Sequence, residues 1–586
     1  MALPPVRHRL HTAVLAVVLL AGAVACAGVP DSSPVQVLRQ VGAGDDVDPP
    51  AAPVEGANMT DLVRGFVTAS ASSSDKHGAA RRFLTPEAAA DWDDGAALTV
   101  LDGQIDTVPV AVDGQAPDTA TVRIRGNKVG KLTAQGAFEA EGGSYSTDLE
   151  LVRRDGQWRI SRLPAGVVVG IEDFRGNYRA VPVWFVDPTR RLLVPDLRYL
   201  PGVPSRAQPA RVLDMLLGGP SSALGGAAAS LLEGAELRAN VAPGSDGTVV
   251  VDLTRITPSD DATRTLIAAQ VVLSLSEVNV LRVRILVDGE PLVSGKPEWT
   301  REDVAALVAQ PRVTGDAAAL VASGGRVGTL SGPVPAAPIP GPAGNGGLVA
   351  ESATTSVDGQ RLAVVARSGP AAQLLVGRTV DGLLEPVGVE GGGLTRPSWA
   401  PSGAEVWTVV DGRRVELVRF RQAGPPAVTE VDADGLTSLG GPITDLRLSR
   451  DGVRVLAVVG GGLYVGAIMR GLDGTVAITA VRQLRSAPPA PVLGPVVSAG
   501  WRSTDSIVAI TRNPDRLIAQ VSVDGLVISE VPTTNLTPPL TALAVSSDRP
   551  LLVTDQTGVW TFAAGVQDAW RQLLSGAGGA VPSYPG

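Results

Sequence analysis

The feature that most limits how this chain can fold is a unit that recurs six times in its C-terminal half. Each unit consists of an apolar strand, a tight turn and a second apolar strand, as in VWTVVDGRRVELV from Val406. The turns fall near residues 324, 369, 412, 460, 513 and 557, which are 45, 43, 48, 53 and 44 residues apart. This even spacing indicates a repeat architecture, with an irregular β-sandwich as the alternative.

Four short strands in about 45 residues match the size of one blade of a β-propeller. A second turn signal precedes several of the units, for example Asp358-Gly359 and Asp451-Gly452. The run WAPSG, from Trp399 to Gly403, resembles the W-S-P-D-G of TolB-type and WD-type propellers. We therefore expect an all-β propeller over residues 312–586, with six blades in a ring and a closing strand from Val566 to Leu574.

The first 25 residues have the layout of a secretory signal peptide. Arg7 and Arg9 form a short positive region, an uncharged and mostly apolar run begins at Ala13, and small residues precede Cys26. A transmembrane helix would need about 20 apolar residues, and this run is shorter. We therefore expect residues 1–25 to be a signal peptide that is removed during export.

The tetrapeptide Ala23-Val24-Ala25-Cys26 resembles the lipobox of bacterial lipoproteins, with Ala23 where Leu or Val is usual. Cys26 is also the only cysteine among the 586 residues. The resemblance implies cleavage between Ala25 and Cys26, and an S-diacylglycerol group and an N-acyl chain such as palmitate on Cys26. Two or more acyl chains anchor a protein stably, so the mature protein would be held at the extracytoplasmic face of the cell membrane. A secreted protein with an incidental cysteine is the alternative.

Composition excludes several functions. The formal net charge is −9 at pH 7 and no Lys/Arg cluster is present in the sequence, so the basic surface of a nucleic-acid-binding protein is missing. His8 and His11 leave with the signal peptide, so His77 is the only histidine of the mature chain. A Ser-His-Asp triad, a Cys-His pair and a tetrahedral zinc site therefore lack the residues that they require. The polar run SSSDKHG around His77 predicts a solvated loop.

Two segments precede the middle of the chain. Residues 26–57 mix Pro, Gly, Asp and Ser without apolar periodicity, which predicts a flexible tether. Helical periodicity begins at Met59, and Thr85-Pro86 starts a further helix. Alternating stretches then predict strands, with a hairpin turn at Asp155-Gly156. Helices followed by a curved antiparallel sheet predict an α+β domain of the NTF2-like kind over residues 58–180.

Residues 181–300 predict a second domain with the order strand, helix, strand, helix, strand. Its strands are expected at 181–186, 248–253 and 282–287, and its helices at 209–217 and 261–276. The helix end LLGGP, from Leu216 to Pro220, and the helix AAQVV, from Ala268 to Val272, resemble the GerMN module of spore-germination and envelope proteins. The resemblance implies an α/β domain for docking, without a known catalytic signature.

Acidic and aromatic residues of the repeats raise two alternatives. Two convergent carboxylates would make a propeller glycosidase, but most acids here lie at turns or strand entries. The acids considered are Asp358, Asp381, Glu405, Asp445 and Asp505.

The run from Asp432 to Gly435 resembles part of a calcium-binding loop, although Leu436 occupies the position where an oxygen ligand belongs. Trp399, Trp407 and Trp501 would stack on envelope glycan, yet each suits a buried position between blades better. We predict no catalytic residue, cofactor or metal.

The lipobox, the α+β domain, the GerMN-like domain and the propeller occur in the order that is typical of the LpqB family of actinobacterial lipoproteins. The resemblance covers nearly the whole chain, and only Cys26 transfers from it by position. It implies a non-catalytic accessory of the MtrA–MtrB two-component system, which engages the extracellular domain of the sensor kinase MtrB. Glycan binding and hydrolysis remain the alternative functions.

Overall fold

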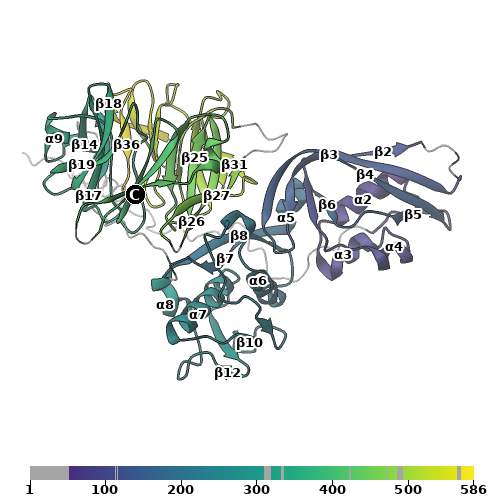
Figure 1. Ribbon diagram of the computed structural model, residues 1–586. Coiled ribbons are helices and arrows are strands. Elements are labelled where there is room, and N and C mark those ends of the chain that lie inside the picture. Colours follow the sequence, from purple (N-terminus) through teal and green to yellow (C-terminus); the bar gives the residue numbers. More distant parts are fainter. Residues whose placement is uncertain are drawn as a thin grey trace, which may run out of the picture. The chain divides into compact units, whose positions relative to one another are not determined.

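The computed structural model describes residues 52–586, apart from gaps at 104, 112–113, 115, 190, 309–317, 331–335, 422–423, 472, 485–492 and 564–568. The expected signal peptide, Ala25 and Cys26 lie outside the described residues, as does the expected tether up to residue 51. Figure 1 colours the chain from purple at the start of the described part to yellow at its end. Three regions follow one another along it.

In the first region, helices pack against a curved sheet that is antiparallel except for the parallel pair β1 and β6 (Figure 1). The sheet has the order β5-β4-β3-β1-β6, and β2 pairs with β3. The α+β architecture expected for the first domain is therefore confirmed. Its elements are α2 (Met59–Ala69), α3 (Ser74–Arg81), α4 (Pro86–Asp91), β1 (Leu98–Leu101), β2 (Asp106–Val110), β3 (Thr119–Leu132), β4 (Phe138–Arg154), β5 (Gln157–Arg162) and β6 (Val167–Gly170).

Local sequence accounts for these boundaries. The Asn58 side chain accepts hydrogen bonds from the backbone N–H groups of Thr60 and Asp61 and so caps α2. Thr85 caps α4 in the same way, with Pro86 in the first turn, as predicted. The hairpin at Asp155-Gly156 is also confirmed, because both residues adopt positive φ angles and strands β4 and β5 pair on either side.

The prediction of a solvated loop at His77 is wrong. The side chain is only 9% exposed, and its Nδ1 lies 2.8 Å from Oδ2 of Asp94, which also pairs with Arg81 at 2.8 Å. Asp75, Lys76 and His77 have φ angles of 51° to 55°, and the imidazole centroid lies 6.0 Å from that of Trp92. The polar run held no sign of this burial, because the carboxylate partner lies 17 residues further along the chain.

The second region contains a sheet of order β12-β11-β10-β9 in which β10 and β11 are parallel. Helix α7 connects these two strands, as a parallel connection requires. The helix is buried around most of its circumference, and its central Gln270 donates to the carbonyl of Trp184. The elements are β9 (Glu236–Leu237), β10 (Thr248–Thr254), α7 (Asp261–Ser276), β11 (Arg282–Val287), β12 (Glu290–Pro291) and α8 (Arg301–Val304).

The first strand of this region differs from the expected arrangement. Strand β7 (Tyr178–Val186) does not join the four-stranded sheet but pairs with β8 (Leu193–Pro201) in a sheet of two strands. Strand β8 was not predicted, and it pairs with β7 along the full length of both strands, from Tyr178 opposite Pro201 to Val186 opposite Leu193. The helices α5 (Ile171–Asn177) and α6 (Gln208–Leu217) lie before and after this pair along the chain.

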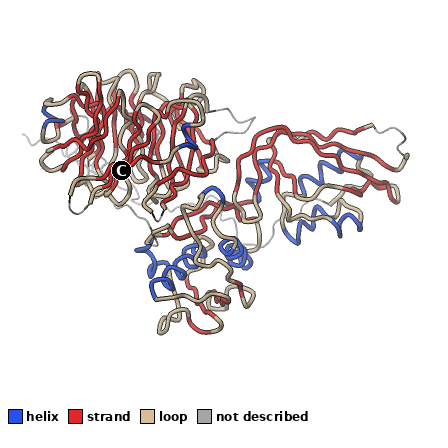
Figure 2. Tube along the Cα trace, in the orientation of Figure 1, coloured by secondary structure: helices blue, strands red, loops and turns tan. Residues whose placement is uncertain are grey.

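The third region consists of six four-stranded antiparallel sheets among the described residues from 319 to 583, which Figure 2 shows as red strands joined by tan loops. All six predicted hairpins are present, each as the second and third strands of a sheet. The inner strands are β36 (Val581–Ser583), β16 (Val349–Thr355), β20 (Ser398–Trp399), β24 (Ile443–Leu448), β28 (Val496–Trp501) and β32 (Ala542–Ala544).

The remaining strands complete the sheets outward. The second and third strands are β13 (Ala319–Ser323) and β14 (Arg326–Leu330), β17 (Arg361–Ser368) and β18 (Ala371–Arg378), β21 (Glu405–Val410) and β22 (Arg414–Arg419), β25 (Arg454–Val459) and β26 (Gly462–Arg470), β29 (Ser506–Thr511) and β30 (Ile518–Ser522), and β33 (Leu552–Thr554) and β34 (Gly558–Ala563). The outer strands are β15 (Ala337–Pro338), β19 (Leu384–Gly391), β23 (Ala427–Val431), β27 (Val476–Gln483), β31 (Ile528–Glu530) and β35 (Ala569–Ser575). Two short helices, α9 (Pro342–Asn345) and α10 (Asp434–Thr437), lie between sheets along the chain.

The inner strands contact one another in the cyclic order β36, β16, β20, β24, β28, β32 and back to β36, so the sheets close into a ring. The closing strand is not the predicted segment from Val566 to Leu574, whose described part belongs to the outer strand β35. It is β36, which pairs with β13 through Leu320 and Ser583. One sheet therefore combines strands from both ends of the propeller sequence.

Candidate functional site

The centre of the ring holds a cavity lined by the inner strands and the loops that follow them. About 70 Å³ is available there to the centres of water-sized molecules, room for several waters or a small ligand group. Three arginines, Arg396, Arg447 and Arg450, line this central cavity, and no Asp or Glu side chain among the described residues does. The side chains that line the cavity therefore carry a net positive charge inside an acidic protein.

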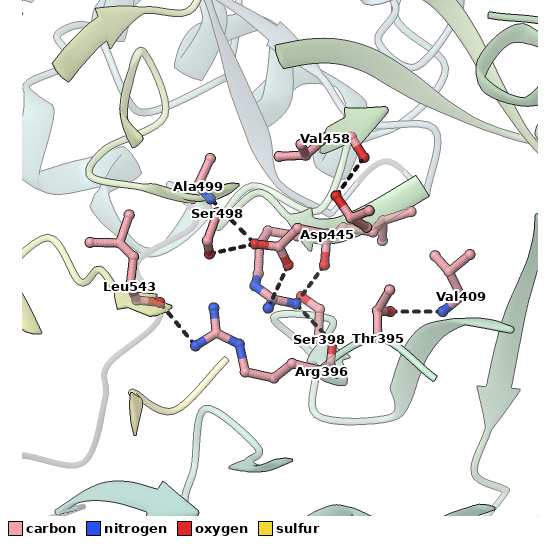
Figure 3. A network of polar contacts seen from close by, with 12 residues as sticks. Thr395, Arg396, Ser398, Val409, Asp445, Val458, Ser498, Ala499 and Leu543 are labelled. Carbon is pink, nitrogen blue, oxygen red and sulfur yellow. Dashed lines mark hydrogen bonds and ion pairs between the residues drawn. The ribbon is translucent and has the colours of Figure 1, made fainter. Parts of the chain in front are cut away.

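Arg396 lies just before β20 and reaches across the ring. Its Nη1 donates to the Leu543 carbonyl on the inner strand β32 at 3.0 Å (Figure 3). The same nitrogen donates to the Pro582 carbonyl on the inner strand β36 at 2.6 Å. The sheet of β32 lies three positions around the ring from that of β20, so this guanidinium joins opposite sides of the propeller. In the described part of the chain, Arg396 makes no ion pair.

Arg447 and Asp445 lie two residues apart on β24 and pair at 2.6 Å. Arg447 Nη1 also donates to the carbonyl of Arg396 at 2.8 Å. The second oxygen of Asp445 accepts from Ser498 Oγ at 2.6 Å and from the Ala499 backbone at 3.2 Å (Figure 3). The one carboxylate of this network is thus shared between a cation and two donors, and Nε of Arg447 is buried with no hydrogen-bond partner among the described residues.

Burial sets the electrostatics of these cations. Desolvation, and after it the neighbouring charge of Arg447, lower the pKa of Arg396 to about 9, although Asp445 opposes the shift. Burial likewise lowers the pKa of Arg447 and of Arg450. The guanidinium groups of Arg396 and Arg447 nevertheless remain charged near neutral pH, because an arginine loses its proton only with great difficulty.

The loops that follow the inner strands share a turn in which a Ser hydroxyl donates to the Asp two residues later. The pairs are Ser356 and Asp358, Ser449 and Asp451, Ser503 and Asp505, and Ser546 and Asp548. Arg450 lies inside one of these turns, and its Nη2 donates to Ser546 Oγ at 2.8 Å. These turns place Arg450 beside the central cavity.

The three tryptophans considered as glycan-stacking residues are buried between sheets, as their alternative interpretation predicted. Trp399, Trp407 and Trp501 are 2%, 0% and 5% exposed. The indole N–H of Trp399 donates to the Thr354 carbonyl at 3.3 Å and that of Trp501 to the Arg447 carbonyl at 3.1 Å, each on the neighbouring sheet. Their ring faces are therefore not offered to a sugar.

Each carboxylate considered as a catalytic acid or base has partners of its own. As predicted, Asp358 and Asp381 lie at turns, where they accept from the backbone of Gln360 and Leu383. Glu405 pairs with two arginines, Asp445 belongs to the arginine network, and Asp505 accepts from Ser503. The five acids come from four different sheets or their connecting loops.

Two further features complete the description of the sites. In the run from Asp432 to Gly435, Asp432 forms a β-bridge with Ala477, Ala433 is buried, and Asp434 and Gly435 begin α10, in which Leu436 is buried. Within the described residues no group of His, Cys, Asp and Glu is arranged to hold a metal ion. None of the helices in the described part is both long and apolar enough to cross a membrane.

Fold and domain order define a class: a multidomain protein with an N-terminal α+β domain, a second domain of the GerMN type and a C-terminal propeller. Family models match all three parts. They describe the N-terminal domain of lipoprotein LpqB at residues 52–175, a sporulation and spore germination domain at 182–293, and the LpqB β-propeller domain at 332–585.

Whole-length relatives agree with these matches. Lipoprotein LpqB of Rhodococcus opacus is 34% identical over 99% of this chain and 98% of its own, and that of Mycolicibacterium smegmatis is 33% identical over 98% and 99%. The chain belongs to the LpqB lipoprotein family. Among solved structures, a putative 6-phosphogluconolactonase from Bacteroides uniformis is 15% identical over 44% of this chain and 82% of its own, with a TM-score of 0.30, which is too weak a similarity to bear on fold or function.

Sequence reasoning missed the arginines of the central cavity. Arg396 and Arg447 lie in unremarkable stretches, TRPSW and DLRLS, and no spacing rule links them. Two features of the sequence could have pointed to Arg396. No acidic residue lies close to it along the chain, and it comes shortly before the WAPSG run, which contributes to an inner strand.

Proposed function

We propose that this protein is a lipid-anchored, non-catalytic accessory of a two-component sensor kinase of the MtrB kind. The chain would be cleaved between Ala25 and Cys26, acylated on Cys26, and held at the extracytoplasmic face of the cell membrane. There it would contact the extracellular domain of the kinase and change its signalling. This role is the one that membership of the LpqB family implies for the chain.

The observation that supports a non-catalytic role is that the side chains a catalytic site would use are already bound to other residues of the propeller. The five acids considered as catalytic residues are held by arginines, hydroxyls and backbone donors, and Trp399, Trp407 and Trp501 are buried between sheets. A glycosidase needs two carboxylates facing one substrate, and a glycan-binding site needs exposed aromatic faces. A protein with neither is better suited to presenting a surface to a partner.

The anchor would make weak docking sufficient. A tether of about thirty residues reaches on the order of 100 Å when extended, which is enough to meet a membrane kinase without leaving the membrane surface. Confinement to one layer raises the effective concentration of each partner for the other. Docking alters signalling only if it favours one state of the kinase over another, so the accessory must distinguish those states.

Isothermal titration calorimetry tests the proposal directly. The mature chain from Ala27, free of lipid, would be titrated with the extracellular domain of the MtrB-like kinase from the same organism, and the extracellular domain of an unrelated sensor kinase would serve as the control. We expect a dissociation constant in the micromolar range or tighter for the MtrB-like domain alone.

A functional readout complements binding. Autophosphorylation of the full-length kinase in vesicles would be measured with and without the acylated lipoprotein, and its rate should change in one direction. Absence of binding at high concentrations of both proteins, with an unchanged rate, would refute the accessory role.

A further inference from the structure

We propose that the central cavity of the propeller binds a small ligand through an oxyanion group, a phosphate or a carboxylate, which Arg396, Arg447 and Arg450 would hold. The proposal concerns a ligand site on this chain and does not depend on the kinase. It begins from the charge of the cavity wall, where three arginines occur and no acidic side chain of the described residues is found.

The charges near the ring centre do not balance. Asp445 compensates Arg447 at 2.6 Å, but Arg396 has only backbone carbonyls as hydrogen-bond partners in the described residues. Arg450 is 3.9 Å from Asp548, a carboxylate that is 57% exposed and therefore a weak partner. Buried charges in proteins are normally paired, so an excess of cations around a cavity favours an anion inside it.

The arginines are also held in place before any ligand arrives. Arg396 is fixed by carbonyls on two inner strands, and Arg447 by its own carboxylate and by the Arg396 carbonyl. Donors that are already oriented lose little conformational entropy when a ligand binds. Guanidinium groups match both carboxylate and phosphate oxygens, often through two parallel hydrogen bonds.

The surroundings strengthen this attraction. Trp501, Leu448 and Val545 supply apolar wall, which lowers the local dielectric and leaves fewer waters to compete with the arginines. The protein as a whole is acidic, with a formal charge of −9, so the attraction for an anion is local to this cavity. A positive cleft with low-dielectric walls concentrates the field on the ligand.

The test measures binding of two probes to the whole mature chain from Ala27 by calorimetry at low ionic strength. Inorganic phosphate represents the phosphate class and succinate the carboxylate class. We expect at least one to bind with a dissociation constant below about 1 mM, and the tighter probe identifies the class of group. No heat of binding with either probe at 10 mM would overturn the proposal.

Variants locate the site. Arg396→Gln should weaken the tighter probe at least tenfold, whereas Arg378→Gln, which removes the same charge from an exposed position on β18, should leave its affinity unchanged. If Arg396→Gln does not fold, as judged by circular dichroism, Arg450→Gln gives the same comparison from the edge of the cavity. Equal affinities of wild type and a folded cavity variant would contradict the assignment.

Discussion

The carboxylate of Glu405 on β21 accepts a hydrogen bond at 2.8 Å from Arg470, which lies at the end of β26 in the next sheet of the ring. A second arginine, Arg419 on β22, pairs with the same carboxylate at 2.9 Å from within its own sheet. Glu405 is 8% exposed. One buried acid thus ties two neighbouring sheets together, and its removal leaves two cations facing each other.

Glu405→Gln should therefore destabilise the propeller by about 2 kcal/mol, because a buried charge network loses its only anion. Urea unfolding monitored by tryptophan fluorescence measures the change. Glu390→Gln, the same substitution at an exposed position of the outer strand β19, is the matched control and should leave the midpoint unchanged. An equal midpoint for wild type and Glu405→Gln would show that the pair contributes nothing net.

The ion pairs of Glu405 also predict that the stability of the propeller depends on pH. Burial raises the pKa of Glu405, but hydrogen bonds and charge from Arg470 and then Arg419 outweigh it, so the pKa lies below the usual 4.5. A lowered pKa in the folded state gives stability that is present above pH 4.5 and is lost as the pH falls through the folded pKa. Unfolding midpoints of wild type and Glu405→Gln should therefore converge at low pH. A difference that stays constant down to pH 3 would rule out this linkage.

A comparison of two buried tryptophans distinguishes the contribution of a hydrogen bond to stability from that of packing. Trp399 donates its indole N–H to Thr354, whereas the N–H of Trp407 has no partner in the described part of the chain. Trp399→Phe leaves a buried carbonyl without its donor, so it should cost about 1 kcal/mol more than Trp407→Phe. Denaturant unfolding of the two variants supplies the comparison, and a larger loss for Trp407→Phe would argue against it.

Ring closure depends on the last strand. Truncation after Gly576 removes β36 and with it the pairing to β13 and the hydrogen bond from Ser583 Oγ to the Ala353 carbonyl at 2.7 Å. Strand β13 without its inner neighbour exposes backbone donors and apolar side chains, so the truncated protein should aggregate or become sensitive to protease. Truncation of Pro585 and Gly586 alone keeps β36 and should remain resistant. Limited proteolysis distinguishes the two, and equal resistance would contradict the closing role of β36.

Cys26→Ser removes the only thiol that lipid could modify. We expect the variant to leave the membrane fraction and to appear in the aqueous phase of a detergent partition, because the proposed acyl chains on Cys26 would supply the anchor. Ala23→Leu, which restores the usual lipobox residue, is the control and should remain in the detergent phase. A Cys26→Ser protein that still sediments with membranes would point to an anchor elsewhere.

Patterns within a few residues were enough for much of the fold. The six hairpins, the capped helix at Thr85-Pro86 and the turn at Asp155-Gly156 rest on local periodicity and turn chemistry, and all are present. Strands β8 and β36 were missed. The latter, Val581–Ser583, is too short for an alternating pattern and contains a proline, so nothing local distinguishes it from a loop.

Amino-acid order alone determined the sequence of domains, the number of repeating hairpins and the interpretation of the tryptophans as buried, because each of these follows from apolar spacing along the chain. Tertiary structure was needed for the burial of His77 beside Asp94, for the choice of closing strand, and for the meeting of Arg396 and Arg447 at the ring centre. The reason is physical: these contacts join residues from different elements, and their energies depend on burial and charge in space, which no local pattern records.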